Sequence, residues 1–362
     1  MKTSIQTIVI AIILLAIITG CASNNQVIKV GVITPLSGEA ASYGQSAKEG
    51  LDLAAMEINN QGGVLGKQIE LVYEDSQADP KIATSIASRL INVEHVSYII
   101  VADGSGATTA IAPMADQTKT IMIGTLGSTP ELKYAGEYFF RTIPSDSAQG
   151  YALAEYAESQ GLNRVAVLYV NDPYGVGLLD SFGTSFNGTI VASESFASGS
   201  LDVRTQLLKI RDENPDGILL VVRNEMPAVM RQIRELGITA EIMASETAKN
   251  QALVDAAGSD AEGLVTVYFA EQEGYPEYVR RFEDTNGHLP PQLSEYSYDC
   301  IYALASAIKN ADSLNNTLVM TAMHAVSFKG ASGRVGFDEY GEVLPGKYLL
   351  FIVRNGTFEQ NV

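Results

Sequence analysis

Short apolar runs alternate with amphipathic stretches along most of the chain. Residues 28–33 (IKVGVI) form a run of strand length, and residues 47–58 then carry apolar side chains at helical spacing. The alternation continues through the first half, where it predicts strands at 69–73, 96–102 and 120–123 and a helix at 80–90. Strands that alternate with helices of this length indicate βαβ units and a parallel sheet.

The same alternation begins again after residue 142. It predicts helices at 151–160, 201–212 and 226–236 and strands at 164–169, 189–194, 217–222, 240–244 and 264–269. Each half places a tyrosine, Tyr43 or Tyr174, in the loop that leaves its first strand. Ligands of open α/β sheets bind beyond the carboxyl ends of the strands, so two facing lobes would bring both tyrosines into one cleft. The alternative is two ordinary solvated loops.

The first 20 residues have the pattern of a signal peptide. Lys2 supplies a positive charge, and residues 8–18 are an unbroken apolar run, shorter than the roughly 17–25 residues that span a bilayer. The Ile-Thr-Gly-Cys sequence that ends at Cys21 resembles the lipobox of bacterial-type lipoproteins. That resemblance implies cleavage after residue 20, a diacylglycerol on the Cys21 sulfur and a tether over residues 21–27. An ordinary cleaved signal peptide or an uncleaved anchor is the alternative.

Length and composition restrict the class of protein further. A chain of 362 residues is long enough for two domains of roughly 150 residues each. The formal net charge of −18 argues against nucleic acid and against an anionic membrane surface as binding partners. Two cysteines exclude a disulfide scaffold, and three histidines leave little material for a metal site. We expect Cys300 to be a buried structural thiol.

The glycine motifs that bind nucleotides or build hydrolase sites have no match in this chain. Residues 62–68 (GGVLGKQ) miss the spacing of a phosphate-binding loop. Residues 104–109 (GSGATT) fit neither a dinucleotide fingerprint nor a nucleophile elbow. We therefore expect no cofactor, no metal and no catalytic residue.

The chain from residue 28 onward resembles the type I periplasmic binding proteins, in particular the leucine/isoleucine/valine-binding proteins of ABC transporters. The resemblance rests on the order and spacing of short segments at 28–44, 57–66, 73–80, 125–132, 140–142, 172–175, 262–263, 298–299 and 333–338. It implies an α/β fold of two doubly wound parallel-sheet lobes that are joined by a three-strand hinge and close over a ligand.

The resemblance also implies how the chain divides between the lobes. We expect crossings near residues 143, 271 and 344. Lobe 1 would then comprise residues 28–142 plus 272–343, and lobe 2 would comprise residues 143–271 plus 344–362.

Four ligand contacts follow from the resemblance for residues that match the family's motifs. Ser105 would bond the ligand carboxylate, and Ser128 would offer its hydroxyl and backbone N–H to the same ligand. The carbonyl of Leu126 would face the ligand ammonium, and Glu246 would pair with that ammonium. The set is chemically coherent, because a zwitterion that leaves water needs donors at one end and a negative group at the other. The alternatives are a helix N-cap for Ser105, a turn serine for Ser128 and a solvated loop carboxylate for Glu246.

Three further residues belong to the implied cleft. Tyr43 and Tyr174 match tyrosines that line it from opposite lobes. Arg223 stands near a position where the family often has a tyrosine, and this departure puts a purely aliphatic pocket in doubt. An inward-pointing Arg223 would favour an acidic or polar ligand side chain, and an outward-pointing Arg223 would be a surface arginine.

The function that the resemblance implies is capture of an amino acid by hinge closure and delivery to the permease of an ABC importer. The protein would lie in the periplasm or on the outer face of the cell membrane, held to the membrane through the lipid on Cys21. The alternatives are a ligand-sensing subunit of a signalling receptor with the same fold, and binding of a short amide or carboxylate.

Overall fold

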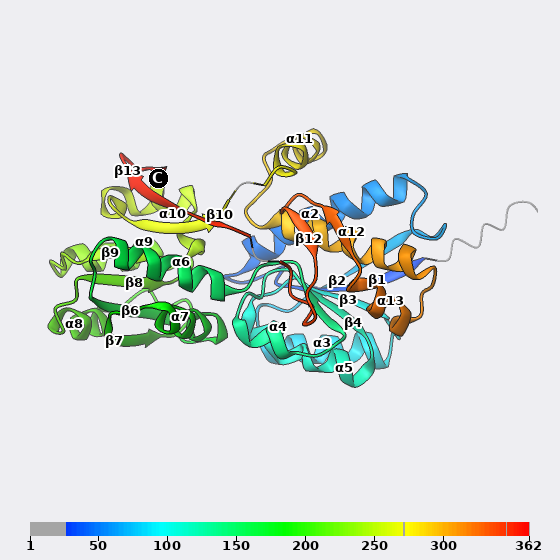
Figure 1. Ribbon diagram of the computed structural model, residues 1–362, viewed down its shortest axis with the longest axis horizontal. Helices are drawn as coiled ribbons and strands as arrows, with labels where there is room; N and C mark the ends of the chain where they lie inside the picture. The colour runs from blue at the N-terminus through cyan, green and yellow to red at the C-terminus, as the bar shows by residue number, and fades with distance from the viewer. Residues whose placement is uncertain (1–26, 271, 345, 362) are drawn as a thin grey trace, which may run out of the picture.

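The computed structural model describes residues 27–361 except residues 271 and 345. Figure 1 shows two α/β lobes that lie side by side along the longest axis of the molecule. The predicted signal peptide, the lipidation site Cys21 and most of the predicted tether lie outside the described residues. None of the described helices combines the length and the apolar character needed to cross a membrane.

The first lobe is built on a five-stranded sheet in which every neighbouring pair of strands is parallel. Its strands are β1 (Ile28–Thr34), β2 (Ile69–Asp75), β3 (Tyr98–Val101), β4 (Ile121–Gly124) and β5 (Phe139–Arg141), in the order β2-β1-β3-β4-β5. The connecting helices are α2 (Ala41–Asn60), α3 (Pro80–Asn92), α4 (Ser105–Ile111), α5 (Pro113–Thr118) and the short η1 (Pro130–Tyr134). β3 and β4 are buried along their whole length, as expected for central strands covered on both faces.

The second lobe is built on a seven-stranded sheet in the order β14-β13-β10-β9-β8-β6-β7. Its parallel strands are β6 (Arg164–Val170), β7 (Thr189–Phe196), β8 (Gly217–Val221), β9 (Glu241–Ala244) and β10 (Val265–Phe269). β13 (Tyr348–Arg354) and β14 (Thr357–Asn361) add an antiparallel edge. The helices are α6 (Asp146–Ser159), α7 (Pro173–Ser185), α8 (Arg204–Asp212), α9 (Met226–Glu235), η2 (Glu246–Ala248), α10 (Gln251–Ala257) and η3 (Gly258–Ala261).

A later part of the chain returns to the first lobe. It forms α11 (Tyr275–Asn286), α12 (Ser294–Ala311), α13 (Asn316–Met323), β11 (Ser327–Lys329) and β12 (Arg334–Gly336). Its buried side chains share one core with β1–β5, whereas Val353 of β13 belongs to the core of the second lobe. α12 lies so close to α2 that a side chain on Gly50 would meet the backbone oxygen of Ser294. The exact lobe boundaries stay predictions.

The predicted α/β class and the parallel sheets are confirmed, but the placement of the two tyrosines in loops is wrong. Tyr43 lies in the first turn of α2, and Tyr174 lies in the first turn of α7. Both helices begin with small or polar residues, so apolar periodicity marks only their later turns. Cys300 lies on α12, fully buried, as predicted, and burial raises the pKa of its thiol.

Candidate functional site

A cavity of about 350 Å³ lies between the two lobes, beyond the carboxyl ends of strands from both sheets. All seven residues predicted from the sequence line it: Tyr43, Ser105, Leu126 and Ser128 from the first lobe and Tyr174, Arg223 and Glu246 from the second. Its volume falls in the range of small-molecule sites. The chain therefore brings together residues as far apart in the sequence as Tyr43 and Glu246, although their roles toward a ligand stay predictions.

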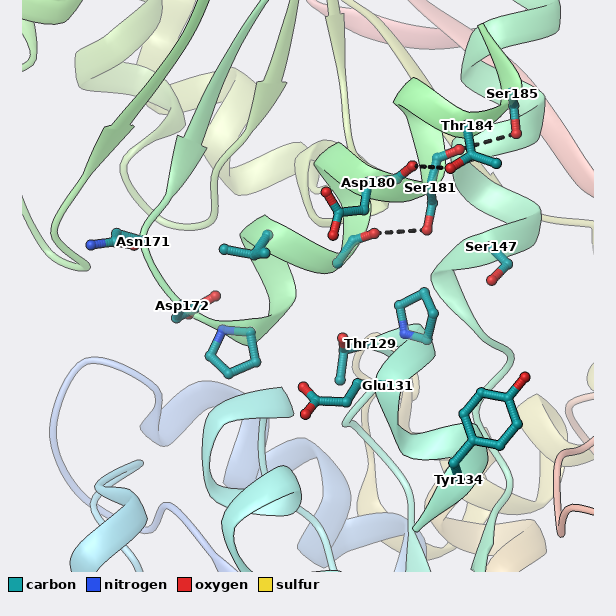
Figure 2. A pocket seen from close by; sticks show the side chains of 14 residues that line it. Thr129, Glu131, Tyr134, Ser147, Asn171, Asp172, Asp180, Ser181, Thr184 and Ser185 are labelled. Atoms are coloured by element: carbon teal, nitrogen blue, oxygen red, sulfur yellow. Dashed lines mark hydrogen bonds between the residues drawn. The ribbon is translucent and has the colours of Figure 1, made fainter.

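A larger groove of about 830 Å³ lies beside this cavity, between η1 and α7 (Figure 2). The hydroxyl groups of Ser181, Thr184 and Ser185 are bonded to the backbone of their own helix. Ser181 Oγ donates to Gly177 O at 2.7 Å, and Ser185 Oγ donates to Ser181 O at 3.0 Å. The smaller inter-lobe cavity brings buried polar groups from both lobes together, so it is the better candidate site.

Ser105 stands at the centre of the first-lobe wall. Its Oγ accepts bonds from the backbone N–H groups of Ser128 and Thr129, both at 3.2 Å. The N-cap of α4 is Gly104, so the alternative of Ser105 as a helix N-cap is wrong. Within the described part of the chain no acceptor takes the hydroxyl proton of Ser105, which leaves it available to an oxygen atom in the cavity.

Glu246 provides the negative group of the second-lobe wall. It begins η2, directly after β9, and is only 5% exposed, so it is not a solvated loop carboxylate. Tyr174 Oη donates to Glu246 Oε2 at 2.9 Å, and the backbone N–H of Glu246 donates to Gln149 Oε1 at 2.9 Å. These bonds hold the carboxylate at the edge of the cavity.

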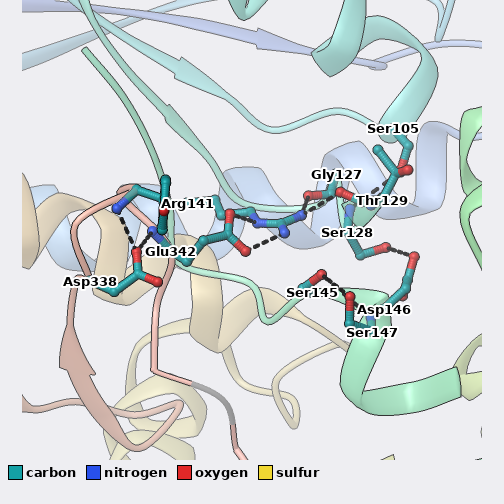
Figure 3. Close-up of polar contacts among 11 residues, drawn as sticks. Ser105, Gly127, Ser128, Thr129, Arg141, Ser145, Asp146, Ser147, Asp338 and Glu342 are labelled. Carbon is teal, nitrogen blue, oxygen red and sulfur yellow. Dashed lines mark hydrogen bonds and ion pairs between the residues drawn. The ribbon is translucent and has the colours of Figure 1, made fainter. Parts of the chain in front are cut away.

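Asp146 places a second buried carboxylate beside Glu246. Asp146 accepts from Ser128 Oγ at 2.9 Å and from Gln149 Nε2 at 3.0 Å, so Gln149 bridges the two acidic residues (Figure 3 shows the Ser128 bond). Burial and the charge of Glu246 raise the pKa of Asp146 well above its usual value. Burial likewise raises the pKa of Glu246, although bonds from Tyr174 and Gln149 oppose the shift.

Arg223 points into the cavity, which settles the direction that the sequence left open. Its Nη2 lies 2.8 Å from Asp172 Oδ2, and its guanidinium lies over the ring of Tyr174, 4.6 Å from the ring centre. Tyr43 faces this group from the first lobe. Burial raises the pKa of Tyr43 to about 12, although the positive charge of Arg223 lowers it in part.

A buried ion pair supports the loop that carries Ser128. Arg141, at the end of β5, is fully buried, and its Nε donates to Glu342 Oε1 at 2.7 Å (Figure 3). Its Nη1 donates to Thr129 O at 2.9 Å and to Gly127 O at 3.3 Å. The guanidinium therefore ties the Gly127–Thr129 turn to a segment two hundred residues later in the chain.

Asp146, Gln149 and Asp172 were not predicted as site residues. No local motif marks Asp146 or Gln149, and the bond from Glu246 to Gln149 joins residues 97 positions apart. The sequence does mark Asp172, because an acidic residue directly before a proline is typical of a helix N-cap. In the structure its Oδ1 accepts a bond from the Gly175 N–H at 3.0 Å. Among the described residues, no group of three or more His, Cys, Asp or Glu side chains is arranged to hold a metal ion.

Comparison with known proteins agrees with this architecture. Residues 27–357 match the family described as "Periplasmic binding protein". The chain belongs to this family, in its type I, Leu/Ile/Val-binding branch. The resemblance inferred from the sequence is therefore confirmed.

Individual relatives match over nearly the whole chain. Leu/Ile/Val-binding protein homolog 2 of Brucella abortus is 29% identical over 343 residues, which cover 91% of each chain. The solved leucine-binding protein LivK of Thermotoga maritima is 28% identical with a TM-score of 0.83, and the match covers 93% of this chain and 98% of the other. LivJ of Streptococcus pneumoniae, solved with isoleucine, is 26% identical with a TM-score of 0.82, covering 92% and 98%.

These matches establish a substrate-binding role. This periplasmic binding protein is not an enzyme, and its family works outside the cytoplasm.

Replacing Glu342 with Gln should destabilise the protein strongly. The change leaves the buried Arg141 guanidinium without its negative partner, which typically costs about 3–5 kcal/mol of unfolding free energy. Urea denaturation measures the effect. Glu359→Gln is the matched control, because Glu359 pairs with Arg354 at 3.8 Å on the exposed surface. This replacement should cost little unfolding free energy. Equal, small losses of unfolding free energy in both variants would contradict a supporting role for the buried Arg141–Glu342 pair.

Proposed function

We propose that the inter-lobe cavity binds an α-amino acid as a zwitterion and that the protein delivers it to the permease of an ABC importer. The observation that carries the proposal is that a negative group lies on one side of the cavity and a hydrogen-bond donor lies on the other. The buried carboxylate of Glu246 stands on one lobe, and the hydroxyl group of Ser105, whose proton has no acceptor among the described residues, stands on the other. A ligand ammonium and a ligand carboxylate would each meet a fixed partner in this arrangement.

The names of the relatives support the same class of solute. They include binding proteins for leucine, isoleucine and valine, and LivJ was solved with isoleucine. In our proposal the Leu126 carbonyl adds an acceptor for the ammonium, and Tyr43 and Tyr174 cover the ligand from opposite lobes. The protein would be held at the membrane by a lipid on Cys21, and no metal or cofactor takes part.

Replacing Glu246 with Gln should weaken binding of the cognate amino acid by about 2–5 kcal/mol, because the ligand ammonium would lose the carboxylate with which it pairs in our proposal. Titration calorimetry measures the effect. Glu241→Gln is the matched control, since Glu241 also accepts a tyrosine hydroxyl bond, from Tyr156, but lies away from the cavity. Unchanged affinity in Glu246→Gln would remove this residue from the site.

Affinity should also fall as the pH is lowered from neutrality toward the ordinary titration range of carboxylates. Burial raises the pKa of Glu246 in the free protein, so its carboxyl takes up a proton earlier than a solvated one during acidification. The protonated group is neutral and attracts an ammonium less, and binding near that pKa must release the proton. Calorimetry across this range measures the change, which Glu246→Gln should flatten. An affinity that rises on acidification would contradict the proposed pairing.

A further inference from the structure

Arg223 places a charged group in the cleft that has no part in the proposed binding of the ligand ammonium and carboxylate. Among the residues that line the cavity, it is the only Lys or Arg. It follows the buried β8 strand, next to β9, which leads to Glu246. Arg223 and Glu246 therefore stand beside each other at the carboxyl edge of the same sheet.

The guanidinium of Arg223 is held in a fixed position. Asp172 Oδ2 bonds it at 2.8 Å, and Asp172 is itself fixed as the N-cap of α7. The ring of Tyr174 supports the guanidinium from below, at 4.6 Å, while the hydroxyl of the same ring bonds Glu246. Arg223 and Glu246 thus contact the same tyrosine side chain, so a ligand whose ammonium pairs with Glu246 would have Arg223 within reach of its other end.

The guanidinium still has donors to offer at this position. Arginine carries five N–H donors, and within the described part of the chain Asp172 is the one acceptor bonded to the Arg223 side chain. Arg223 lines the cavity and its side chain is 23% exposed, so part of the side chain is open to a ligand. Space continues past it into an adjoining hollow of about 260 Å³ that Arg223, Tyr43 and Asn224 help to line.

The charges around Arg223 decide which kind of acceptor fits. Asp172 already neutralises the guanidinium, and the other acidic residues that line the cavity are Asp103 and Glu246. An anionic ligand side chain would add a charge to a site that is already negative. A neutral oxygen on the ligand side chain could accept hydrogen bonds from Arg223 without adding charge. An aliphatic side chain would leave the Arg223 donors without an acceptor when the cleft closes.

We propose that Arg223 is the specificity-determining residue of the cleft and selects α-amino acids whose side chains carry a neutral oxygen, as an amide or a hydroxyl. This inference rests on the proposed function and names the ligand class within it. Branched aliphatic and acidic amino acids are the disfavoured classes.

Calorimetric titration of the wild-type protein tests the inference with three sets of amino acids. The sets are glutamine, asparagine, threonine and serine; leucine, isoleucine and valine; and glutamate and aspartate. The best neutral polar ligand should bind roughly 10- to 100-fold more tightly than the best member of either other set, as expected for hydrogen bonds to a charged group.

The variant Arg223→Met should remove that preference, and Arg223→Lys should retain part of it. Arg211→Met is the matched control, because Arg211 lies on the exposed surface of α8 and pairs with Asp212 at 3.4 Å. Thermal melts without ligand establish that each variant is folded, so a lost preference reports on the site itself.

The outcomes separate this inference from the function on which it rests. If no α-amino acid binds the wild-type protein, the proposed function fails and the inference fails with it. If aliphatic or acidic amino acids bind the wild-type protein most tightly, the inference alone is wrong. A preference for neutral polar ligands that survives in Arg223→Met would also overturn the role of Arg223.

Discussion

Glu246 and Asp146 place two carboxylates side by side at the junction of the lobes, almost wholly removed from water. A buried charge is costly unless it is paired or well bonded. Tyr174, Gln149 and Ser128 supply bonds, but the raised pKa values of both acids show that these do not fully offset the burial. In the proposed function a ligand ammonium would gain from this imbalance, and poorly stabilised negative charge would create affinity.

That arrangement depends on parts of the chain that are far apart. Ser128 belongs to a turn held by Arg141, and Arg141 is in turn paired with Glu342 near the return of the chain to the second lobe. The Ser128–Asp146 bond then connects this turn to the first residue of α6. The same bonds therefore stabilise the junction between the lobes and position the polar groups of the cavity, which links the hinge to the site.

Much of this organisation was predictable from the sequence. The alternation of apolar runs identified β1 to β4 and β6 to β10, because central parallel strands are nearly all apolar and short. Ser105 and Glu246 were assigned through family resemblance, since neither residue type nor spacing alone marks a ligand contact. Gln149 was not predicted, because its partner Glu246 lies 97 positions away and only the folded chain brings them together. Arg223 was identified from the sequence as a departure from the tyrosine that the family often has near this position. The direction of its side chain depends on contacts with Asp172 and Tyr174, which the sequence does not show.

Titration calorimetry with an α-amino acid and its analogue without the amino group tests the central claim most directly. Both ligands share the carboxylate and the side chain, so their difference isolates the ammonium that Glu246 is proposed to bind. The account predicts that the analogue binds more weakly by about 2–5 kcal/mol, as for the loss of one member of a buried charge pair. Equal affinities for the two ligands would contradict it.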